Sequence, residues 1–360
     1  MDIMIVLKLI VGLILLVVGA EALVRGASRI AASFGITPLV IGLTVVAFGT
    51  SSPELAVSVM SSLSGASDIA LGNVVGSNIF NVLFILGISA LIIPLAVHQQ
   101  IIKMDVPILI GLSLLTWWMA SDGNIQVWEG SILILLGIAY MLLLIRMSKK
   151  EKKAIEQEYD EAFGEQKGKS GKIWMSALFV LAGLALLVLG SRWLVDGAVY
   201  IAKSLGVSDL VIGLTIIAAG TSLPEVATSI IAALRGERDI AVGNVVGSNL
   251  FNIFFILGIA AVSGGGIGVA DSAIRFDLPV MTVVAFACLP IFFTGSKLDR
   301  WEGAVFLLYY IAYTAYLILA SQNSSSLEAY SHAILWFAVP ITILTLGIVT
   351  WRQAKRNKAV

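Results

Sequence analysis

The sequence predicts an all-α polytopic membrane protein with two inverted five-helix repeats and one extra C-terminal transmembrane helix. The composition points to the membrane, because 58% of the residues are hydrophobic and only 13% are charged, whereas a soluble domain carries about 25% charged residues. The organisation follows from an internal duplication. The stretch 35–90 recurs without a gap as 206–261, and 35 of the 56 aligned positions are identical. Such self-similarity indicates a duplicated structural unit.

Eleven apolar stretches are candidates for membrane-spanning helices, because each is close to or above the length of about 20 residues that crosses a bilayer. The fourth is the shortest. The first starts with Asp2 and continues as a long helix, so we expect a retained membrane segment and no cleaved signal peptide. The predicted spans are 3–24, 37–64, 69–95, 105–120, 126–146, 173–202, 208–234, 240–263, 277–294, 302–320 and 333–351.

A hydrophilic stretch at 147–172 divides the chain between the fifth and sixth spans. It carries seven lysines and an acidic run, so it cannot cross a membrane and is expected to be an exposed loop. We therefore predict a first repeat at 1–146 with its duplicated motif at 35–90. The loop at 147–172 and a second repeat at 173–320, with its motif at 206–261, follow. An extra helix and a basic tail at 321–360 have no counterpart in the duplication.

Basic residues set the expected orientation. With the N-terminus outside and the spans alternating, 19 of the 23 Lys and Arg residues face the cytoplasm, including those of the loop and the C-terminal tail. This agrees with the positive-inside rule and predicts a multi-pass protein of the plasma (inner) membrane. Because five is odd, the second repeat must enter the membrane in the opposite orientation. Inverted repeats are typical of alternating-access secondary transporters.

Weaker echoes extend the duplication beyond its central stretch. Glu21 and Arg25 are equivalent to Arg192 and Asp196, and each pair is expected to bond within its own helix, because its members are four residues apart. The tripeptide Trp-Glu-Gly occurs at 128–130 and 301–303, and Asp-x-Pro occurs at 105–107 and 277–279. We interpret both motifs as interfacial anchors and helix starts.

The second predicted span contains a helix break beside a carboxylate. Pro53 removes a backbone donor and clashes with the carbonyl of Gly49, four residues earlier. A broken helix at membrane depth is tolerated only in the protein interior or beside a water-filled cavity. Glu54 follows directly, and an ionisable residue at this depth marks an ion pathway by default. The seventh span repeats the pattern with Gly220, Pro224 and Glu225.

The third and eighth spans add amides and hydroxyls. Asn73, Ser77 and Asn81 are spaced by four and share one helical face, whereas Asn78 is expected to turn toward a neighbouring helix. The eighth span repeats these positions as Asn244, Ser248, Asn249 and Asn252. We assign Gly72, Gly76, Ser58 and Ser229 to helix packing. Thr44 and Thr215 are left open between a bond within the helix and a role in the site.

The candidate ligands are all oxygen atoms, which suits hard cations. Two carboxylates balance the charge of one divalent cation, and Ca²⁺ binds carboxylate, amide and backbone oxygens. A soft-metal site is disfavoured because the motifs contain no Cys or Met. His98 and His332 lie far apart at segment ends, so we expect them to be interfacial and not metal ligands. The single cysteine, Cys288, excludes an intrachain disulfide framework.

Two motifs, each present twice, carry a family resemblance. Gly-Thr-Ser-x-Pro-Glu at 49–54 and 220–225, with Gly-Asn-Val-Val-Gly-Ser-Asn-x-Phe-Asn at 72–81 and 243–252, resembles the two α-repeats of the Ca²⁺/cation antiporter superfamily. The sequence looks most like a prokaryotic Na⁺/Ca²⁺ exchanger. This resemblance implies countertransport of Na⁺ and Ca²⁺ at a mid-membrane site between the second, third, seventh and eighth helices. It also implies that the first and sixth helices slide across a fixed core.

The resemblance further implies roles for individual residues. Glu54 and Glu225 would be the central Ca²⁺ ligands and would also bind Na⁺. Further Na⁺ ligands would be Thr50, Ser51, Thr221, Ser222 and the backbone oxygens of Ala47 and Ala218, with Ser77 and Ser248 at outer sodium sites and Asn81 at the centre. The chain departs from many sodium/calcium exchangers at Asn252, where they have Asp, so its site carries two carboxylates and not three. The extra helix at 333–351 lies beyond the ten that the family core needs.

Several alternatives remain. The proton-coupled branch of the superfamily usually has Gly-Asn-x-x-Glu in place of Gly-Thr-Ser-x-Pro-Glu, so the Thr and Ser oxygens here favour Na⁺ over H⁺. A cation channel could use the same oxygens as a filter, but two Glu in inverted repeats favour an antiporter. An intramembrane enzyme would need a nucleophile–base or metal–His constellation, which the spans lack.

We therefore expect a transporter and not an enzyme. Its partners would be small inorganic cations and the lipid bilayer, without nucleic acid and without a cofactor beyond the transported Ca²⁺ and Na⁺. The sequence does not separate Ca²⁺ from other divalent cations, and it predicts no oligomeric state.

Overall fold

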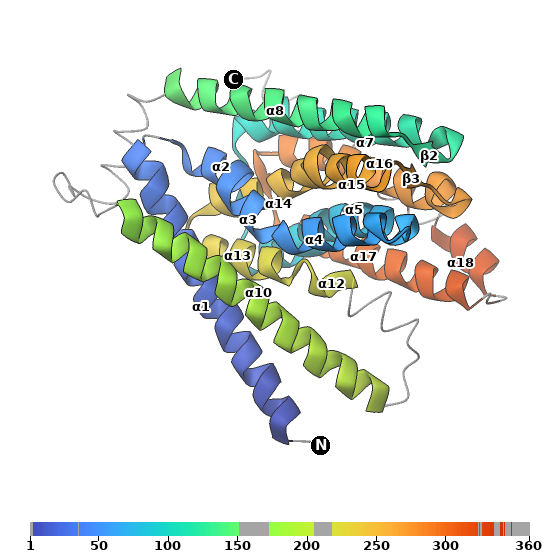
Figure 1. Ribbon diagram of the computed structural model, residues 1–360, viewed down its shortest axis with the longest axis horizontal. Coiled ribbons are helices and arrows are strands. Elements are labelled where there is room, and N and C mark those ends of the chain that lie inside the picture. The colour runs from blue at the N-terminus through green and yellow to red at the C-terminus, as the bar shows by residue number, and fades with distance from the viewer. Residues whose placement is uncertain are drawn as a thin grey trace.

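The computed structural model describes residues 3–34, 36–150, 173–204 and 218–322, together with 324, 326–334, 339, 340, 342 and 347. Most of this part of the chain is helical, and most of the helices pack into one bundle (Figure 1). Eight of the described helices are long and apolar enough to span a membrane, and a bent pair, Pro38–Thr50 with Ser52–Leu63, makes a ninth. The chain is therefore an all-α polytopic membrane protein.

The elements of the first half follow the predicted order. They are α1 (Ile3–Phe34), α2 (Pro38–Ile41), η1 (Gly42–Val46), α3 (Ala47–Thr50), α4 (Ser52–Leu63), α5 (Ser67–Phe80), η2 (Asn81–Leu86), α6 (Gly87–Ile92), β1 (Leu95–Ala96), η3 (Ile101–Asp105), α7 (Val106–Met119), η4 (Ala120–Asp122), β2 (Asn124–Ile125) and α8 (Val127–Lys150). Here η1, η2 and η3 are π-helical turns and η4 is a 3₁₀ turn.

The second half repeats this order. Its elements are α10 (Ile173–Ser204), α12 (Ala218–Gly220), α13 (Leu223–Leu234), α14 (Arg238–Phe251), η6 (Asn252–Leu257), α15 (Gly258–Gly264), β3 (Ile267–Gly268), η7 (Ala273–Asp277), α16 (Leu278–Phe293), β4 (Lys297–Leu298) and α17 (Arg300–Ser321), followed by α18 (Leu327–Ala333). The π-helical turns η6 and η7 stand where η2 and η3 stand in the first half.

The first helix is longer than predicted. The sequence places its end near residue 24, but α1 continues to Phe34. The basic residues at this end of the helix have partners, since Arg25 pairs with Glu21 and the Arg29 guanidinium lies 5.6 Å from the centre of the Phe179 ring. The predicted span 208–234 is described only from residue 218, and the predicted eleventh span 333–351 lies almost wholly outside the described residues.

Two short antiparallel ladders join the halves. β1 pairs with β4, with Leu95 opposite Leu298, and β2 pairs with β3, with Ile125 opposite Ile267. β1 follows the third membrane helix and meets β4, which precedes the tenth. β3 follows the eighth and meets β2, which precedes the fifth. The arrangement has the two-fold correspondence that the duplication predicts, and it ties the two repeats into one core.

Helices α1 and α10 pack backbone to backbone at one side of the bundle (Figure 1). Glycines spaced by seven residues make this contact possible. A Cβ atom at Gly19 would lie 2.9 Å from the backbone oxygen of Gly183, and one at Gly190 would lie 2.7 Å from that of Gly12. Small residues allow such close approach between membrane helices. The two helices therefore form one closely packed pair.

The charged residues of this helix pair do not follow the predicted pattern in both copies. Glu21 bonds to Arg25 within α1, as expected. It also accepts a hydrogen bond from Arg235 at the end of α13, with a Nε–Oε2 distance of 2.8 Å. In α10, where both residues are described, no hydrogen bond or ion pair joins Arg192 to Asp196, so the predicted pair is wrong there. Arg192 instead lines a cavity beside the first helix break.

The aspartates of the two Asp-x-Pro motifs each accept a hydrogen bond from a tyrosine. Asp105 is fully buried and accepts a hydrogen bond from the hydroxyl of Tyr140 at 3.0 Å. In the second half Tyr313 donates to Asp277 at 2.8 Å. These bonds tie the fourth helix to the fifth and the ninth to the tenth. Asp105 and Asp277 directly precede α7 and α16, so the predicted helix starts are confirmed, and the interfacial position of the motifs stays a prediction.

The Trp-Glu-Gly motifs do mark helix starts. Glu129 and Glu302 each accept a hydrogen bond, at 2.8 Å, from the backbone amide three residues earlier. Such back-bonding satisfies an amide that has no partner within the helix. The glycine that follows each glutamate also has a packing role, because Cβ atoms at Gly130 and Gly303 would approach the backbone oxygens of Gly258 and Gly87 within 2.8 Å and 2.7 Å.

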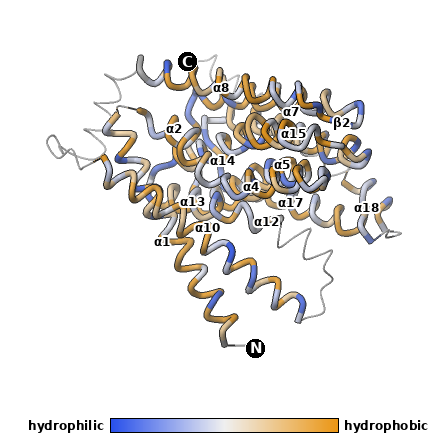
Figure 2. Tube along the Cα trace, viewed as in Figure 1, coloured by the Kyte–Doolittle hydropathy of each residue, from blue (hydrophilic) through white to orange (hydrophobic). Residues whose placement is uncertain are grey.

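The surface is apolar, with hydrophobic residues along the outer helices (Figure 2). On α1 and α10, Leu7, Leu13, Trp174 and Leu181 are each more than half exposed. Since water would penalise so much exposed apolar area, this surface fits a lipid environment.

Candidate ion-binding site

Two helix breaks lie at the centre of the fold. In the first half, the axes before and after Ser51 differ by 49°. Ser51 has φ −84° and ψ 9°, and its counterpart Ser222 has φ −90° and ψ 9°. Pro53 and Pro224 stand in the first turn of the helix that follows each break, where a missing amide proton costs least. The sequence therefore builds the same break twice.

The carbonyl freed by the second proline is satisfied from α10. Pro224 cannot bond to the oxygen of Gly220, four residues earlier. The hydroxyl of Ser191 donates to that oxygen instead, at 2.6 Å. The equivalent position in α1 is Ala20, which has no donor. The two breaks are thus alike in backbone shape and unlike in their contacts with α1 and α10.

Glu54 and Glu225 are buried, each with 1% of its surface exposed. Each carboxylate is bonded by a serine of the opposite repeat. Ser222 donates to Glu54 Oε1 at 3.0 Å, and Ser51 donates to Glu225 Oε1 at 2.9 Å. The carboxylates therefore belong to one site that both repeats build together.

Two asparagines brace the helices that carry the glutamates. Asn73 donates to the backbone oxygen of Glu54 at 3.1 Å and to the hydroxyl of Ser58 at 2.9 Å. Asn244 does the same in the second repeat, with distances of 3.4 Å to Glu225 and 3.0 Å to Ser229. The two serines are buried between packed helices, as predicted, and each also accepts a hydrogen bond that orients an asparagine.

Four further amides form a symmetrical cluster between α5 and α14. Asn81 donates to Asn249 Oδ1, and Asn252 donates to Asn78 Oδ1, both at 2.9 Å. Asn78 and Asn249 in turn donate to each other's backbone oxygens, at 3.4 Å and 3.2 Å. The predicted turn of Asn78 toward a neighbouring helix is confirmed. Asn81 and Asn252 begin π-helical turns, which are frequent at functional sites.

The hydrogen bonds of the site leave a set of oxygen atoms unused. These atoms are buried and have no partner among the described residues, although buried polar groups are usually bonded. Those at predicted site residues are Glu54 Oε2, Glu225 Oε2, Asn81 Oδ1, Asn252 Oδ1 and Ser248 Oγ. Because the amide nitrogens of both asparagines are already committed, their remaining polar atoms are acceptors. The arrangement is suited to hard cations, which bind oxygen.

The remaining predicted site residues lie around these oxygens. Ser222 also donates to the hydroxyl of Ser77, at 3.3 Å, so Ser77 adjoins the Glu54 carboxylate. The backbone oxygen of Ala47 accepts the amide of Ser51 at 3.0 Å and the hydroxyl of Thr50 at 3.4 Å. Thr221 faces the Glu54 carboxylate. Ala218 is the first residue of α12.

Thr44 and the motif glycines are involved in contacts within and between helices. Thr44 donates to the backbone oxygen of Val40 at 2.6 Å, which settles its role as a bond within the helix. Thr215 lies outside the described residues. Gly247, the counterpart of Gly76, lies at a close helix contact, since a Cβ there would lie 2.6 Å from the Cα of Leu43. Position 214, the equivalent of Leu43, lies outside the described residues, so the packing role of Gly72 and Gly76 stays a prediction.

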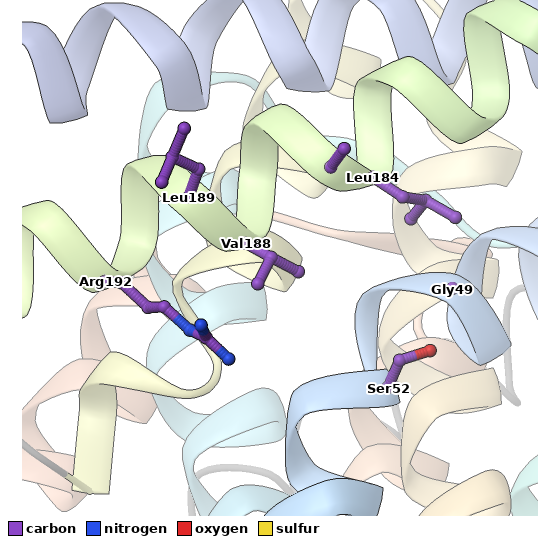
Figure 3. A pocket seen from close by; sticks show the side chains of 7 residues that line it. Gly49, Ser52, Leu184, Val188, Leu189 and Arg192 are labelled. Carbon is purple, nitrogen blue, oxygen red and sulfur yellow. The ribbon is translucent and has the colours of Figure 1, made fainter.

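A cavity of about 320 Å³ opens beside the first break. Leu184, Val188 and Arg192 line it from one face of α10, and Gly49 and Ser52 line it from the break (Figure 3). Gly49 and Ser52 flank Thr50 and Ser51 in the sequence. The cavity therefore lies beside the segment that carries Thr50 and Ser51, although neither residue lines it.

The chain matches the family model described as sodium/calcium exchanger protein over residues 4–146 and 175–319. It is 40% identical over 317 residues to CaxA of Alkalimonas amylolytica, with 87% of this chain and 98% of the relative covered. It is 35% identical over 342 residues to the sodium/calcium exchanger MaX1 of Methanosarcina acetivorans, with 86% and 97% covered.

The fold is also similar to that of a solved exchanger. The structure of the sodium-calcium exchanger NCX_Mj soaked with Na⁺ and Ca²⁺ aligns with a TM-score of 0.73 at 32% identity, covering 88% of this chain and 99% of the other. The duplicated breaks, the paired glutamates and the crossed serine bonds thus occur in a chain that belongs to the sodium/calcium exchanger family.

Proposed function

We propose that this protein is a secondary active antiporter that moves Ca²⁺ in exchange for Na⁺ by alternating access. The observation that carries the proposal is the convergence of Glu54 and Glu225, two buried carboxylates with unpartnered oxygens, from equivalent helix breaks. Their two negative charges match one Ca²⁺. The neutral Ser and Thr oxygens at the same breaks add ligands that suit Na⁺. A proton as counter-ion would not need these ligands.

The proposed ligand set is the one predicted from the motifs. It comprises Glu54, Glu225, Thr50, Ser51, Thr221, Ser222, Ser77, Ser248, Asn81, Asn252 and the backbone oxygens of Ala47 and Ala218. Crossed bonds between repeats support this set, because they bring residues far apart in the chain to one place. The cavity beside Gly49 supports an approach to the site between α10 and the first break.

We place the protein in the plasma membrane. In the proposed orientation the N-terminus lies outside, and the 147–172 loop and the C-terminus lie in the cytoplasm. The pairing of segments supports alternation of the spans. β1 and β4, both expected at the cytoplasmic face, pair with each other, and β2 and β3, both expected outside, do likewise. Glu21 of α1 also bonds Arg235 at the end of α13, another predicted cytoplasmic position.

The counter-ion is tested by ⁴⁵Ca²⁺ uptake into proteoliposomes loaded with Na⁺ and diluted into Na⁺-free buffer at equal pH inside and out. We expect uptake that requires internal Na⁺. Uptake that ignores Na⁺ and follows a pH gradient would instead assign the protein to proton-coupled exchange. Uphill movement of Ca²⁺ on a Na⁺ gradient would exclude a channel.

The site is tested with Glu54→Gln and Glu225→Gln. Glutamine keeps the shape and can still accept the serine bond, but it removes one of the two negative charges. Losing one partner of a buried charge interaction costs about 2–5 kcal/mol, so we expect uptake to fall to background. Glu328→Gln, at an exposed glutamate of α18, is the control and should transport normally. Normal uptake by either buried variant, in protein that elutes as a folded species, would refute the assignment.

A further inference from the structure

Asn244 contacts the site from outside the proposed ligand set. It is fully buried in α14. Both groups that its Nδ2 contacts, the Glu225 backbone oxygen and the Ser229 hydroxyl, belong to its own repeat. Its Oδ1 faces Thr50 of the other repeat, 3.2 Å from the threonine hydroxyl. A single side chain therefore links the helix that carries Glu225 to the break that precedes Glu54.

The orientation of this amide is fixed by its surroundings. The Glu225 backbone oxygen is an acceptor and has no proton to give. A flipped amide would set its own oxygen against that carbonyl oxygen, which is unfavourable. The Nδ2 group must therefore point to Glu225 and Ser229, and Oδ1 must point to Thr50. The assignment follows from the network of bonds, as it must for any amide.

The fixed amide offers the threonine proton an acceptor away from the carboxylates. The hydroxyl of Thr50 has three acceptors around it, which are Asn244 Oδ1 at 3.2 Å, the backbone oxygen of Ala47 at 3.4 Å and the carboxylate of Glu225. None of them donates, so the hydroxyl must donate to one of them. When it donates to Asn244, the lone pairs of Thr50 Oγ1 are turned away from its proton and are available to a cation. A hydroxyl without such an acceptor could turn its proton toward the site and repel the ion.

We propose that Asn244 is a positioning residue that presents the hydroxyl of Thr50 as a ligand for Na⁺. The inference rests on the proposed function, because it assumes that Thr50 binds the counter-ion. Asn244 also braces the backbone of Glu225, but the carboxylate keeps its own bond from Ser51. Loss of Asn244 should therefore weaken Na⁺ binding more than Ca²⁺ binding.

The test is the ion dependence of exchange by Asn244→Ala in proteoliposomes. We expect the half-saturating Na⁺ concentration to rise about three- to tenfold, in line with the loss of one buried hydrogen bond. We expect the half-saturating Ca²⁺ concentration to change less than about twofold. Ser113→Ala is the matched control, because Ser113 is equally buried and bonds only to Leu109 of its own helix. It should leave both values at those of the parent.

A double-mutant cycle with Thr50→Val separates positioning from a loss of structure. If Asn244 acts through Thr50, adding Asn244→Ala to Thr50→Val should change the Na⁺ dependence no further. Thr50→Val alone should reproduce the Na⁺ shift, and it leaves the brace on Glu225 intact, so it serves even if Asn244→Ala does not fold. Thr50→Ser keeps the hydroxyl and should restore the parental Na⁺ dependence.

The outcomes distinguish this inference from the proposed function. A parent protein whose uptake does not depend on Na⁺ would refute the proposed function and the inference with it. A Na⁺-dependent parent with additive effects of the two substitutions would refute the role of Asn244 alone. Equal shifts in the Na⁺ and Ca²⁺ dependence of Asn244→Ala, or an unchanged Na⁺ dependence of Thr50→Val, would also overturn it.

Discussion

At the scale of single residues, Glu237 is a carboxylate outside the spans whose protonation affects the fold. It precedes α14 and is half-buried, and the hydroxyl of Ser28 in α1 donates to it at 3.3 Å. Burial raises the pKa of Glu237 above 4.5, the bond from Ser28 opposes that shift, and the nearby charge of Asp239 adds to it. The folded protein therefore holds this proton more tightly than the unfolded chain does.

This shift predicts that Glu237→Gln is stabilising at neutral pH. Because the folded-state pKa lies above the unfolded one, ionisation of Glu237 lowers stability as the pH rises through the folded pKa. The glutamine cannot ionise. We expect the melting temperature of the variant in detergent to exceed that of the parent at pH 7–8, with the difference vanishing below about pH 4.5. A parent that melts higher than the variant at pH 8 would contradict the assignment.

The central residues of the site could be predicted from the sequence, whereas their partners could not. Glu54 and Glu225 stand out because a carboxylate in an apolar span is costly and therefore informative. The bond from Ser51 to Glu225 crosses 174 positions, and spacing along one helix carries no information about such a contact. Ser229 looks like a packing residue in the sequence because its acceptor role depends on Asn244, which lies on another helix.

At the scale of elements, the contact between α1 and α10 depends on the absence of side chains. A Cβ atom at Gly183 would lie 2.7 Å from the backbone nitrogen of Leu23 and 2.8 Å from the backbone oxygen of Gly19. Both are backbone atoms, which move only if the helices separate. Sequence analysis predicted both helices but not this contact, since the glycine spacing of seven was not recognised.

We predict that Gly183→Ala destabilises the protein by about 1–3 kcal/mol, which is the usual cost of overpacking. Gly111→Ala in α7 is the control, because a Cβ there meets nothing within 4 Å. The control should match or slightly exceed the parent in stability, since alanine favours helix over glycine. Denaturation in detergent measures both variants. Equal stability of Gly183→Ala and the parent would show that α1 and α10 do not pack as closely as described.

The boundaries of elements were the least predictable feature at this scale. The first helix continues to Phe34, beyond its predicted span, where Arg25 bonds to Glu21 within the helix and Arg29 lies over the ring of Phe179, far along the chain. The breaks were predictable because proline acts locally and its effect on the carbonyl four residues back needs no tertiary information. The hydrogen bond from Ser191 to the Gly220 oxygen could not be predicted, because it depends on which helix lies beside the break.

At the scale of the whole molecule, the duplication is nearly symmetrical in the site and unsymmetrical in its contacts with the α1–α10 pair. Ser191 of α10 bonds the freed oxygen of the second break, whereas α10 meets the first break through Leu184, which lies against Gly49 beside a cavity. In the opposite state of the proposed alternating-access cycle, two-fold symmetry would bring α1 to the first break with Ala20 in place of Ser191. That state would lack one hydrogen bond.

This difference predicts parallel effects of two substitutions. One buried hydrogen bond contributes about 0.5–1.5 kcal/mol, which is about two- to tenfold in the ratio of the access states. Ser191→Ala should remove the bond from the present state, and Ala20→Ser should add a bond to the opposite state, so both variants should shift the population toward the opposite state. At a given face of oriented proteoliposomes, the half-saturating Ca²⁺ concentration should move in the same direction for both variants. Opposite changes of the two variants at one face would show that the bond does not distinguish the states.

The difference between Ser191 and Ala20, which occupy equivalent positions in the two repeats, also affects the resting state of the exchanger. A ligand binds with an apparent affinity that scales with the fraction of molecules in the receptive state. With the same oxygen ligands and unequal populations, the two faces of the membrane would see different affinities for the same ion. At rest, most molecules would then be open to the same side of the membrane and would bind an ion from that compartment first, although the two halves arose by duplication.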